Sequence, residues 1–265
     1  MNDKFSWKRF GLFVRAELSG ECRSLLLTLG GFVVFCIVMY MLWNVKVIFG
    51  GGQVGYNGGL SYVTSRFFVL VGMGFIVYFN LSGSFKRYFS KGRASAALML
   101  PAARSEKFLY ALLLNLVAIP LVLIALALLN DVMWAGLLGF DNICRALSSF
   151  FARVHTPAEE MLISAWSVTA NLVSTFSGMA FFFLGAVVFR RYHFLLTVLA
   201  SFILSIPSFV YVQYTAMTDP VVLRDFILWL GSDAGGGTIM ACGVFFTFFW
   251  IFVAWRRFST LQITR

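Results

Sequence analysis

Six long runs of apolar residues, separated by shorter polar stretches, dominate the pattern along the chain. They cover approximately residues 25–43, 67–84, 108–129, 161–189, 194–214 and 235–255. A helix that crosses a bilayer needs about 20 mostly apolar residues. No Asp, Glu, Lys, Arg or His lies in the middle of any run. The pattern therefore predicts an all-α integral membrane protein with six transmembrane helices in a single domain over residues 1–265.

The N-terminal stretch has a different, amphipathic pattern. Its apolar residues recur at helical spacing, with Lys, Arg and Glu between them: Phe5, Trp7, Phe10, Phe13, Val14 and Leu18. This pattern predicts a helix over residues 1–24 that lies in the membrane interface. An ordinary N-terminal helix packed on the protein remains the alternative.

Several predictions concern the segments between the runs. Phe49 to Leu60 is rich in glycine and is expected to be an external loop. Residues 130–160 are expected outside, with a second interfacial helix, and residues 215–237 contain an apolar patch too short to span, so a re-entrant segment is expected there. The third run is expected to begin with Ser105 as its N-cap and to kink at Pro120.

Composition and charge agree with a membrane protein. Hydrophobic residues make up 60% of the chain and charged residues 12%, with a mean hydropathy of +0.86. A net charge of +10 could suggest nucleic acid, but the basic residues flank the apolar runs. With the N-terminus inside, 16 of the 21 Lys and Arg residues fall on the inner side. The positive-inside rule therefore predicts that both termini are cytoplasmic.

The segment from Phe85 to Leu109 carries the densest positive charge. It contains six basic residues and a single acid, Glu106. It is longer than a tight helix–helix turn, and Pro101 interrupts it. We expect a short surface helix followed by a helix start, together forming a cytoplasmic docking element. The alternative is a basic anchor that only sets orientation.

The sequence lacks the motifs of familiar catalytic chemistry. There is no H-E-x-x-H pair, no G-x-x-x-x-G-K-[ST] loop and no metal-ligand spacing among the four cysteines. The absence of ionisable residues within the spans also argues against proton-driven transport. We therefore expect neither an enzyme nor a metal or cofactor site, and any ATP energy must come from a partner chain.

Two short motifs carry a family resemblance. The run Leu98-Met99-Leu100-Pro101, continuing to Glu106-Lys107-Phe108, resembles a segment of bacterial ABC transporter permease subunits of the type-2 exporter class. The tail from Trp255-Arg256-Arg257-Phe258 to Ile263 is similar to the way many of those chains end.

The resemblance implies a permease subunit of an ATP-driven exporter in the bacterial inner membrane. It implies a second permease copy or homologue and cytoplasmic ABC ATPase subunits as partners, besides membrane lipids; nucleic acid is not expected. The implied ATPase-docking residues are Lys86, Arg87, Lys91, Arg93, Leu98, Pro101, Arg104, Glu106 and Lys107. Phe226 and Trp229 are the implied re-entrant or pathway residues. The alternative function is a non-transporting membrane anchor or regulatory subunit.

Overall fold

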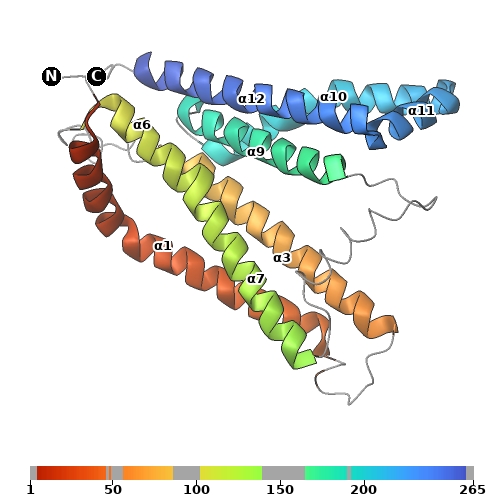
Figure 1. The fold of residues 1–265 in the computed structure, drawn as a ribbon, viewed down its shortest axis with the longest axis horizontal. Helices are drawn as coiled ribbons and strands as arrows, with labels where there is room; N and C mark the ends of the chain where they lie inside the picture. Colours follow the sequence, from red (N-terminus) through yellow and green to blue (C-terminus); the bar gives the residue numbers. More distant parts are fainter. Residues whose placement is uncertain are drawn as a thin grey trace. The chain divides into compact units, whose positions relative to one another are not determined.

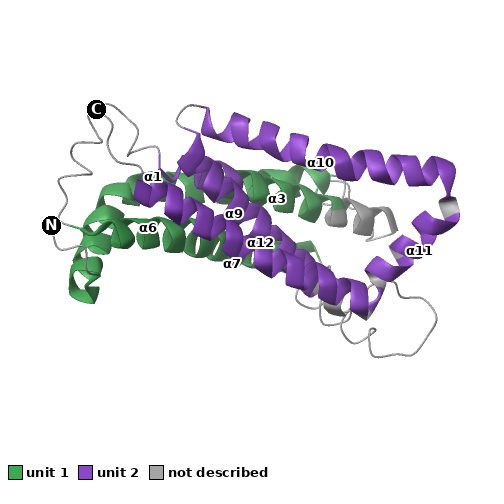
Figure 2. Cartoon of the chain, turned by 90° about the horizontal axis from the view of Figure 1, so that it is seen from above, with its two compact units in different colours: residues 1–77, 101–150 green, residues 78–100, 151–265 purple. Residues whose placement is uncertain are grey.

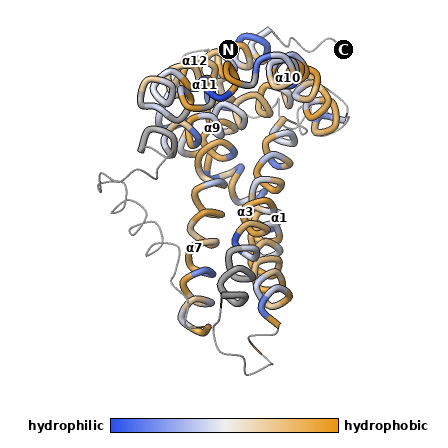
Figure 3. Tube along the Cα trace, turned by 90° about the vertical axis from the view of Figure 1, so that its right-hand side faces the viewer, coloured by the Kyte–Doolittle hydropathy of each residue, from blue (hydrophilic) through white to orange (hydrophobic). Residues whose placement is uncertain are grey.

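The chain is helical throughout the part that the computed structural model describes, which comprises residues 5–45, 48, 56–85, 102–138, 165–189 and 192–260. The elements are α1 (Trp7–Trp43), α3 (Tyr56–Gly83), α6 (Arg104–Leu112), the π-helix η1 (Leu113–Ala118), α7 (Ile119–Leu138), α9 (Ala165–Val188), α10 (His193–Thr218), α11 (Pro220–Gly231) and α12 (Asp233–Thr260) (Figure 1). Within these described ranges, six helical segments are long and apolar enough to cross a membrane, with α6, η1 and α7 counted as one. The prediction of six such helices is confirmed, and Figure 3 shows how apolar residues dominate along them.

The helices form two compact units (Figure 2). Unit 1 comprises residues 1–77 and 101–150, and unit 2 comprises residues 78–100 and 151–265. The helix α3 is continuous across the boundary, so its last six residues belong to unit 2. The basic segment between residues 85 and 109 also passes from one unit to the other.

In unit 1, α1 runs parallel to α6 and α7. Contacts at the start of α1 pair Arg9 with Glu106 and Phe13 with Tyr110. Near the end of α1, Tyr40 contacts Asp131. The residue numbers of the contacting partners rise in the same order on both sides, which shows that the helices run in the same direction. The rings of Trp43 and Phe68 stack with centroids 5.2 Å apart, which places the end of α1 beside the first half of α3.

The N-terminal helix is continuous with the first span. Instead of a separate interfacial helix over residues 1–24, α1 runs unbroken for 37 residues, although Figure 1 shows that it bends. Phe10, Phe13 and Glu17 are buried on one face, whereas Trp7 and Leu12 are largely exposed. The buried stripe follows helical spacing, as expected for a helix packed on the protein.

Three local boundaries of unit 1 differ from the sequence-based predictions. The N-cap of α6 is Ala103, not Ser105. The third span continues to Leu138, beyond the expected end at 129, because apolar residues recur after Asp131 and its charge is paired. The helix α3 begins at Tyr56, inside the stretch expected to be a loop.

The region before Pro120 adopts a wider helical turn. Residues Leu113–Ala118 form the π-helix η1, and the N–H of Ile119 bonds to the carbonyl of Leu114. Pro120 has no N–H to donate to the helix, and π turns and prolines are both recognised sites of helix irregularity. The sequence predicted a kink at Pro120. The structure has a π-helix immediately before this proline.

In unit 2, α9 and α12 pack closely along their length and run parallel. Val173 lies against Gly243, and seven or eight residues further on the rings of Phe181 and Trp250 meet at 5.2 Å. Only four residues separate α9, which ends at Val188, from α10, which begins at His193. Tyr192 occupies the left-handed region in this turn, with a φ of 52°.

Beyond the turn, α10 makes few contacts. The residues from Phe202 to Tyr214 are all exposed. The short helix α11 then connects α10 to α12 (Figure 2). With 12 residues it is about 18 Å long, less than the roughly 30 Å of a hydrocarbon core. The predicted inability of this segment to span is confirmed.

Candidate functional site

A two-point ion pair joins the N-terminal helix to the start of α6. The Arg9 Nη2 lies 2.7 Å from Oε1 of Glu106, and its Nε lies 3.0 Å from both carboxylate oxygens. The backbone N–H of Ser6 donates to Oε1 at 3.0 Å, and that of Ala103 donates to Oε2 at 2.9 Å. The Glu106 side chain is 0% exposed. We call Ser6, Arg9, Ala103 and Glu106 the N-terminal clamp.

The clamp explains how a carboxylate is tolerated in a buried position. Arg9 and Glu106 precede the uncharged stretches of their helices, residues 24–43 and 108–130, so the pair lies outside the segments that would span the membrane. The hydrogen bond from Arg9 lowers the pKa of Glu106, against the opposite effect of burial. The two backbone N–H donors also lower it. Glu106 therefore remains ionised at neutral pH.

A second charged group lies next to the clamp. Lys107 is buried, and burial lowers the pKa of its ammonium group, while the negative charges of Glu17 and Glu106 act to raise it. Glu17 is buried as well. The start of α6 is thus attached to α1 by the Arg9–Glu106 ion pair and by the electrostatic attraction between Lys107 and Glu17. The T-shaped contact of Phe13 with Tyr110 adds an aromatic contact between the same two helices.

The other end of the basic segment is attached in unit 2. Phe85 is 0% exposed. Its ring contacts Phe183 of α9 at 5.2 Å and Phe258 of α12 at 5.1 Å between centroids. The segment therefore leaves an aromatic cluster in unit 2 and enters the N-terminal clamp in unit 1.

The predicted docking residues fall into two groups. Lys86, Arg87, Lys91, Arg93, Leu98 and Pro101 lie outside the described residues, as do the expected short surface helix and the second interfacial helix. Of the other three, only Arg104 is exposed. Glu106 and Lys107 are buried against α1, where they position the start of α6.

A polar cluster that sequence reasoning did not identify lies near the other end of unit 1. Asp131 accepts hydrogen bonds from the Tyr40 hydroxyl at 2.7 Å and from Nε and Nη2 of Arg66 at 2.8 and 3.2 Å. Asp131 is 2% exposed. The ring of Tyr40 stacks on Trp134 at 6.0 Å. Residues from α1, α3 and α7 are thereby joined at one point.

Two donors beside this cluster have no partner within the described part of the chain. They are Nδ2 of Asn130 and Nε1 of Trp134, both on residues that are 8% exposed. Unpaired buried donors are costly, so a water or an acceptor group would be favoured there. The sequence offered one indication of the polar cluster: Asp131 follows one apolar run, and Arg66 precedes another.

The predicted re-entrant residues share one face of α11. The rings of Phe226 and Trp229 stack with centroids 6.1 Å apart and are inclined by 22°. Both side chains remain about 40% exposed, at 40% and 42%. They form an apolar face on a helix that is too short to span.

The described residues contain no group of three or more His, Cys, Asp or Glu that could hold a metal ion. No protein-family model, curated protein or solved structure matches the chain. The class of the protein therefore rests on its own helices, which are those of a multi-pass membrane protein.

Proposed function

We propose that the chain is the membrane-spanning permease subunit of an ATP-driven exporter of the bacterial inner membrane. In this proposal two permease chains form the pathway, and separate cytoplasmic ATPase subunits supply the energy. The observation that supports it best is the attachment of the basic segment at both ends, at Phe85 in unit 2 and at Glu106 in unit 1. A docking element must be held firmly if it is to transmit movement.

The mechanism follows from these attachments. ATP-driven closure of the partner subunits would displace the basic segment, which carries the helices that continue from it, α3 and α6. The N-terminal clamp would transmit the displacement of α6 to α1, because Arg9 holds Glu106 through both carboxylate oxygens. The π-helix η1 provides a place where the third span can change its bend.

The re-entrant assignment of α11 belongs to the same proposal. Its exposed apolar face would dip into the outer leaflet and return, with Phe226 and Trp229 near the pathway. The exposed Phe and Met residues of the spans favour an amphiphilic cargo.

Co-purification tests the proposal. The tagged chain is expressed with its genomic neighbours and isolated in a mild detergent. An ATPase subunit should co-purify with the chain in stoichiometric amount. Reconstitution of the ATPase with the chain should change the rate of ATP hydrolysis. If no ATPase co-purifies, the chain is instead the non-transporting anchor or regulatory subunit that the sequence left open.

Two variants test whether the ATPase docks at the basic segment. Arg104→Ala removes an exposed charge within the basic segment and should weaken ATPase binding directly. Arg224→Ala removes an exposed charge from α11, which is expected on the opposite side of the membrane, and should leave binding unchanged. Equal effects of the two substitutions would contradict docking at the basic segment.

A further inference from the structure

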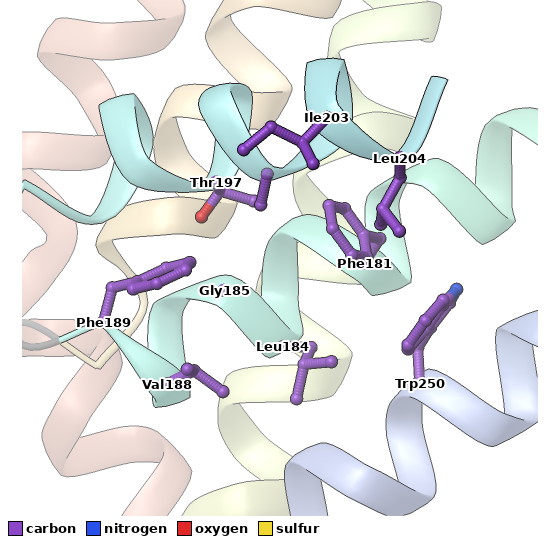
Figure 4. Close-up of a pocket in the computed structure, with 10 residues that line it drawn as sticks. Phe181, Leu184, Gly185, Val188, Phe189, Thr197, Ile203, Leu204 and Trp250 are labelled. Atoms are coloured by element: carbon purple, nitrogen blue, oxygen red, sulfur yellow. The ribbon is translucent and has the colours of Figure 1, made fainter. Parts of the chain in front are cut away.

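A groove of about 390 Å³ lies between α9, α10 and α12 in unit 2 (Figure 4). Its volume falls in the usual range for a small-molecule site. Its lining is apolar: Phe181, Leu184, Val188, Phe189, Ala200, Ile203, Leu204 and Trp250, together with Gly185 and Thr197. The hydroxyl of Thr197 donates to the carbonyl of His193 at 2.6 Å, so it is already satisfied within its own helix. The groove therefore offers an occupant only apolar contact.

The groove exists because α9 and α10 approach closely at one end only. A Cβ on Gly185 would lie 2.9 Å from the Cβ of Thr197 and nearer still to other Thr197 atoms. Gly185 thus allows contact near the turn between the two helices. Thr197 is 0% exposed, whereas Ile203 and Leu204, two turns further along α10, are 57% and 60% exposed. The helices separate beyond the contact, and the groove opens between them.

Positive charge lies at one end of this groove. On α12, Trp250, Ala254 and Arg257 follow the spacing i, i+4, i+7 and share one face of the helix. Arg257 is therefore about two turns, or about 10 Å, from the groove residue Trp250, toward the end of the helix. Arg257 and the adjacent Arg256 are both exposed.

The described acids of unit 2 are far from these arginines. They are Asp219 between α10 and α11, Asp225 in α11 and Asp233 at the first position of α12. Asp233 precedes Arg257 by 24 positions in one continuous helix, which corresponds to about 36 Å. An apolar groove with positive charge at one end is complementary to a molecule with an apolar chain and an anionic head.

We infer that this groove binds an anionic phospholipid, with one acyl chain between α9, α10 and α12 and its phosphate beside Arg257. Bulk bilayer lipid is the natural source, because the groove opens between helices apolar enough to span the membrane. Basic sites between transmembrane helices are known to select anionic head groups. The inference goes beyond the proposed exporter function and does not depend on it.

The test uses the full chain in lipid nanodiscs with photoreactive lipids. Phosphatidylglycerol and phosphatidylcholine probes, each with a diazirine midway along one acyl chain, are crosslinked and the labelled peptides mapped. Labelling should concentrate on the groove stretches 181–204 and around 250, several-fold more with the phosphatidylglycerol probe. Uniform labelling of all exposed helices, or equal labelling by the two probes, would overturn the inference.

Two matched pairs of variants localise the site. Ala200→Phe fills the groove and should reduce labelling there at least fivefold, whereas Ala216→Phe, on the exposed part of the same helix, should not. Arg257→Gln should remove the preference for phosphatidylglycerol and leave phosphatidylcholine labelling unchanged, whereas Arg224→Gln should have no effect. Arg257 is exposed, so this variant stays informative if Ala200→Phe fails to fold. A retained preference in Arg257→Gln would refute the assigned head-group site.

Discussion

Arg9 and Glu106, separated by 97 positions in the sequence, form a two-point ion pair that attaches the first helix to the start of the third span. The pair is reinforced by two backbone N–H groups that donate to the same carboxylate. Neither the Arg9 side chain nor that of Glu106 is interchangeable with another of the same charge, because Arg9 supplies donors to both oxygens and Glu106 accepts from two separate segments.

The first prediction is that neutralising Glu106 loosens the N-terminus. Glu106→Gln should lower the Tm of the purified chain by several degrees, because it removes the charge that Arg9 contacts and replaces one acceptor oxygen by a donor amide. Limited proteolysis should also cut the first turns of α1 faster. The control is Arg15→Gln, an exposed position on the same helix, which should leave the Tm within about 2 °C of the wild type. A similar Tm for both variants would mean that the clamp is not stabilising.

The second prediction concerns acid pH. The pKa of Glu106 is lower in the folded protein than its ordinary value of 4.5, mainly because of Arg9. Its contribution to stability is therefore fully present above pH 4.5 and is lost as the pH falls through the folded-state pKa. Tm measured against pH should fall below pH 4.5 in the wild type. The fall should be shallower in Glu106→Gln, and identical curves would exclude this group as its cause.

The third prediction concerns the polar cluster around Asp131. Asp131→Asn leaves Arg66 largely buried without its counter-charge, at a cost of about 3–5 kcal/mol. Asp225→Asn, at an exposed position on α11, should cost less than about 0.5 kcal/mol. Denaturant titration of the detergent-solubilised variants measures both. The double variant Arg66→Met with Asp131→Leu should recover much of the loss, since it removes both buried charges; no recovery would show that the cluster contributes more than charge pairing.

The apolar runs predicted the six long helices because each run is long, uncharged and bounded by polar residues. Helix ends were less predictable. Asp131 reads as the start of an external segment, yet its charge is neutralised by Arg66, a residue 65 positions away, so the helix continues to Leu138. Local sequence does not contain that long-range pairing.

Only part of the candidate site could be predicted, because its other contacts also join residues that are far apart in the sequence. The charge density of residues 85–109 identified the basic segment. Helical spacing identified Phe10 and Phe13 of the buried stripe of α1, but the same predicted face included Trp7, which is exposed. That Glu106 turns toward Arg9 could not be read from the sequence, because either residue could equally have faced solvent or a partner chain. The groove in unit 2 depends on the contact between Gly185 and Thr197, a tertiary feature without a local pattern.

The fourth prediction is the orientation of the chain. In a background in which Cys22, Cys36, Cys144 and Cys242 are replaced by Ser, a cysteine at Ser90 in the basic segment should be protected from a membrane-impermeant maleimide in intact cells. A cysteine at the exposed Thr218 should be labelled. Permeabilised cells provide the control, in which both positions react. Labelling of Ser90→Cys in intact cells would reverse the predicted orientation and with it the proposed docking of a cytoplasmic ATPase.

The fifth prediction concerns the turn that places α11 beside α12. A Cβ on Gly235 would lie 2.8 Å from the carbonyl carbon of Trp229 and 2.9 Å from the Cα of Leu230. Because these are backbone atoms, Gly235→Ala can be accommodated only if α11 moves away from α12. Gly237 is in the same helix, and a Cβ there meets nothing within 4 Å, so Gly237→Ala should be neutral or stabilise by up to about 1 kcal/mol. Hydrogen exchange should therefore increase over residues 226–231 in Gly235→Ala alone, and equal exchange in the two variants would contradict this packing.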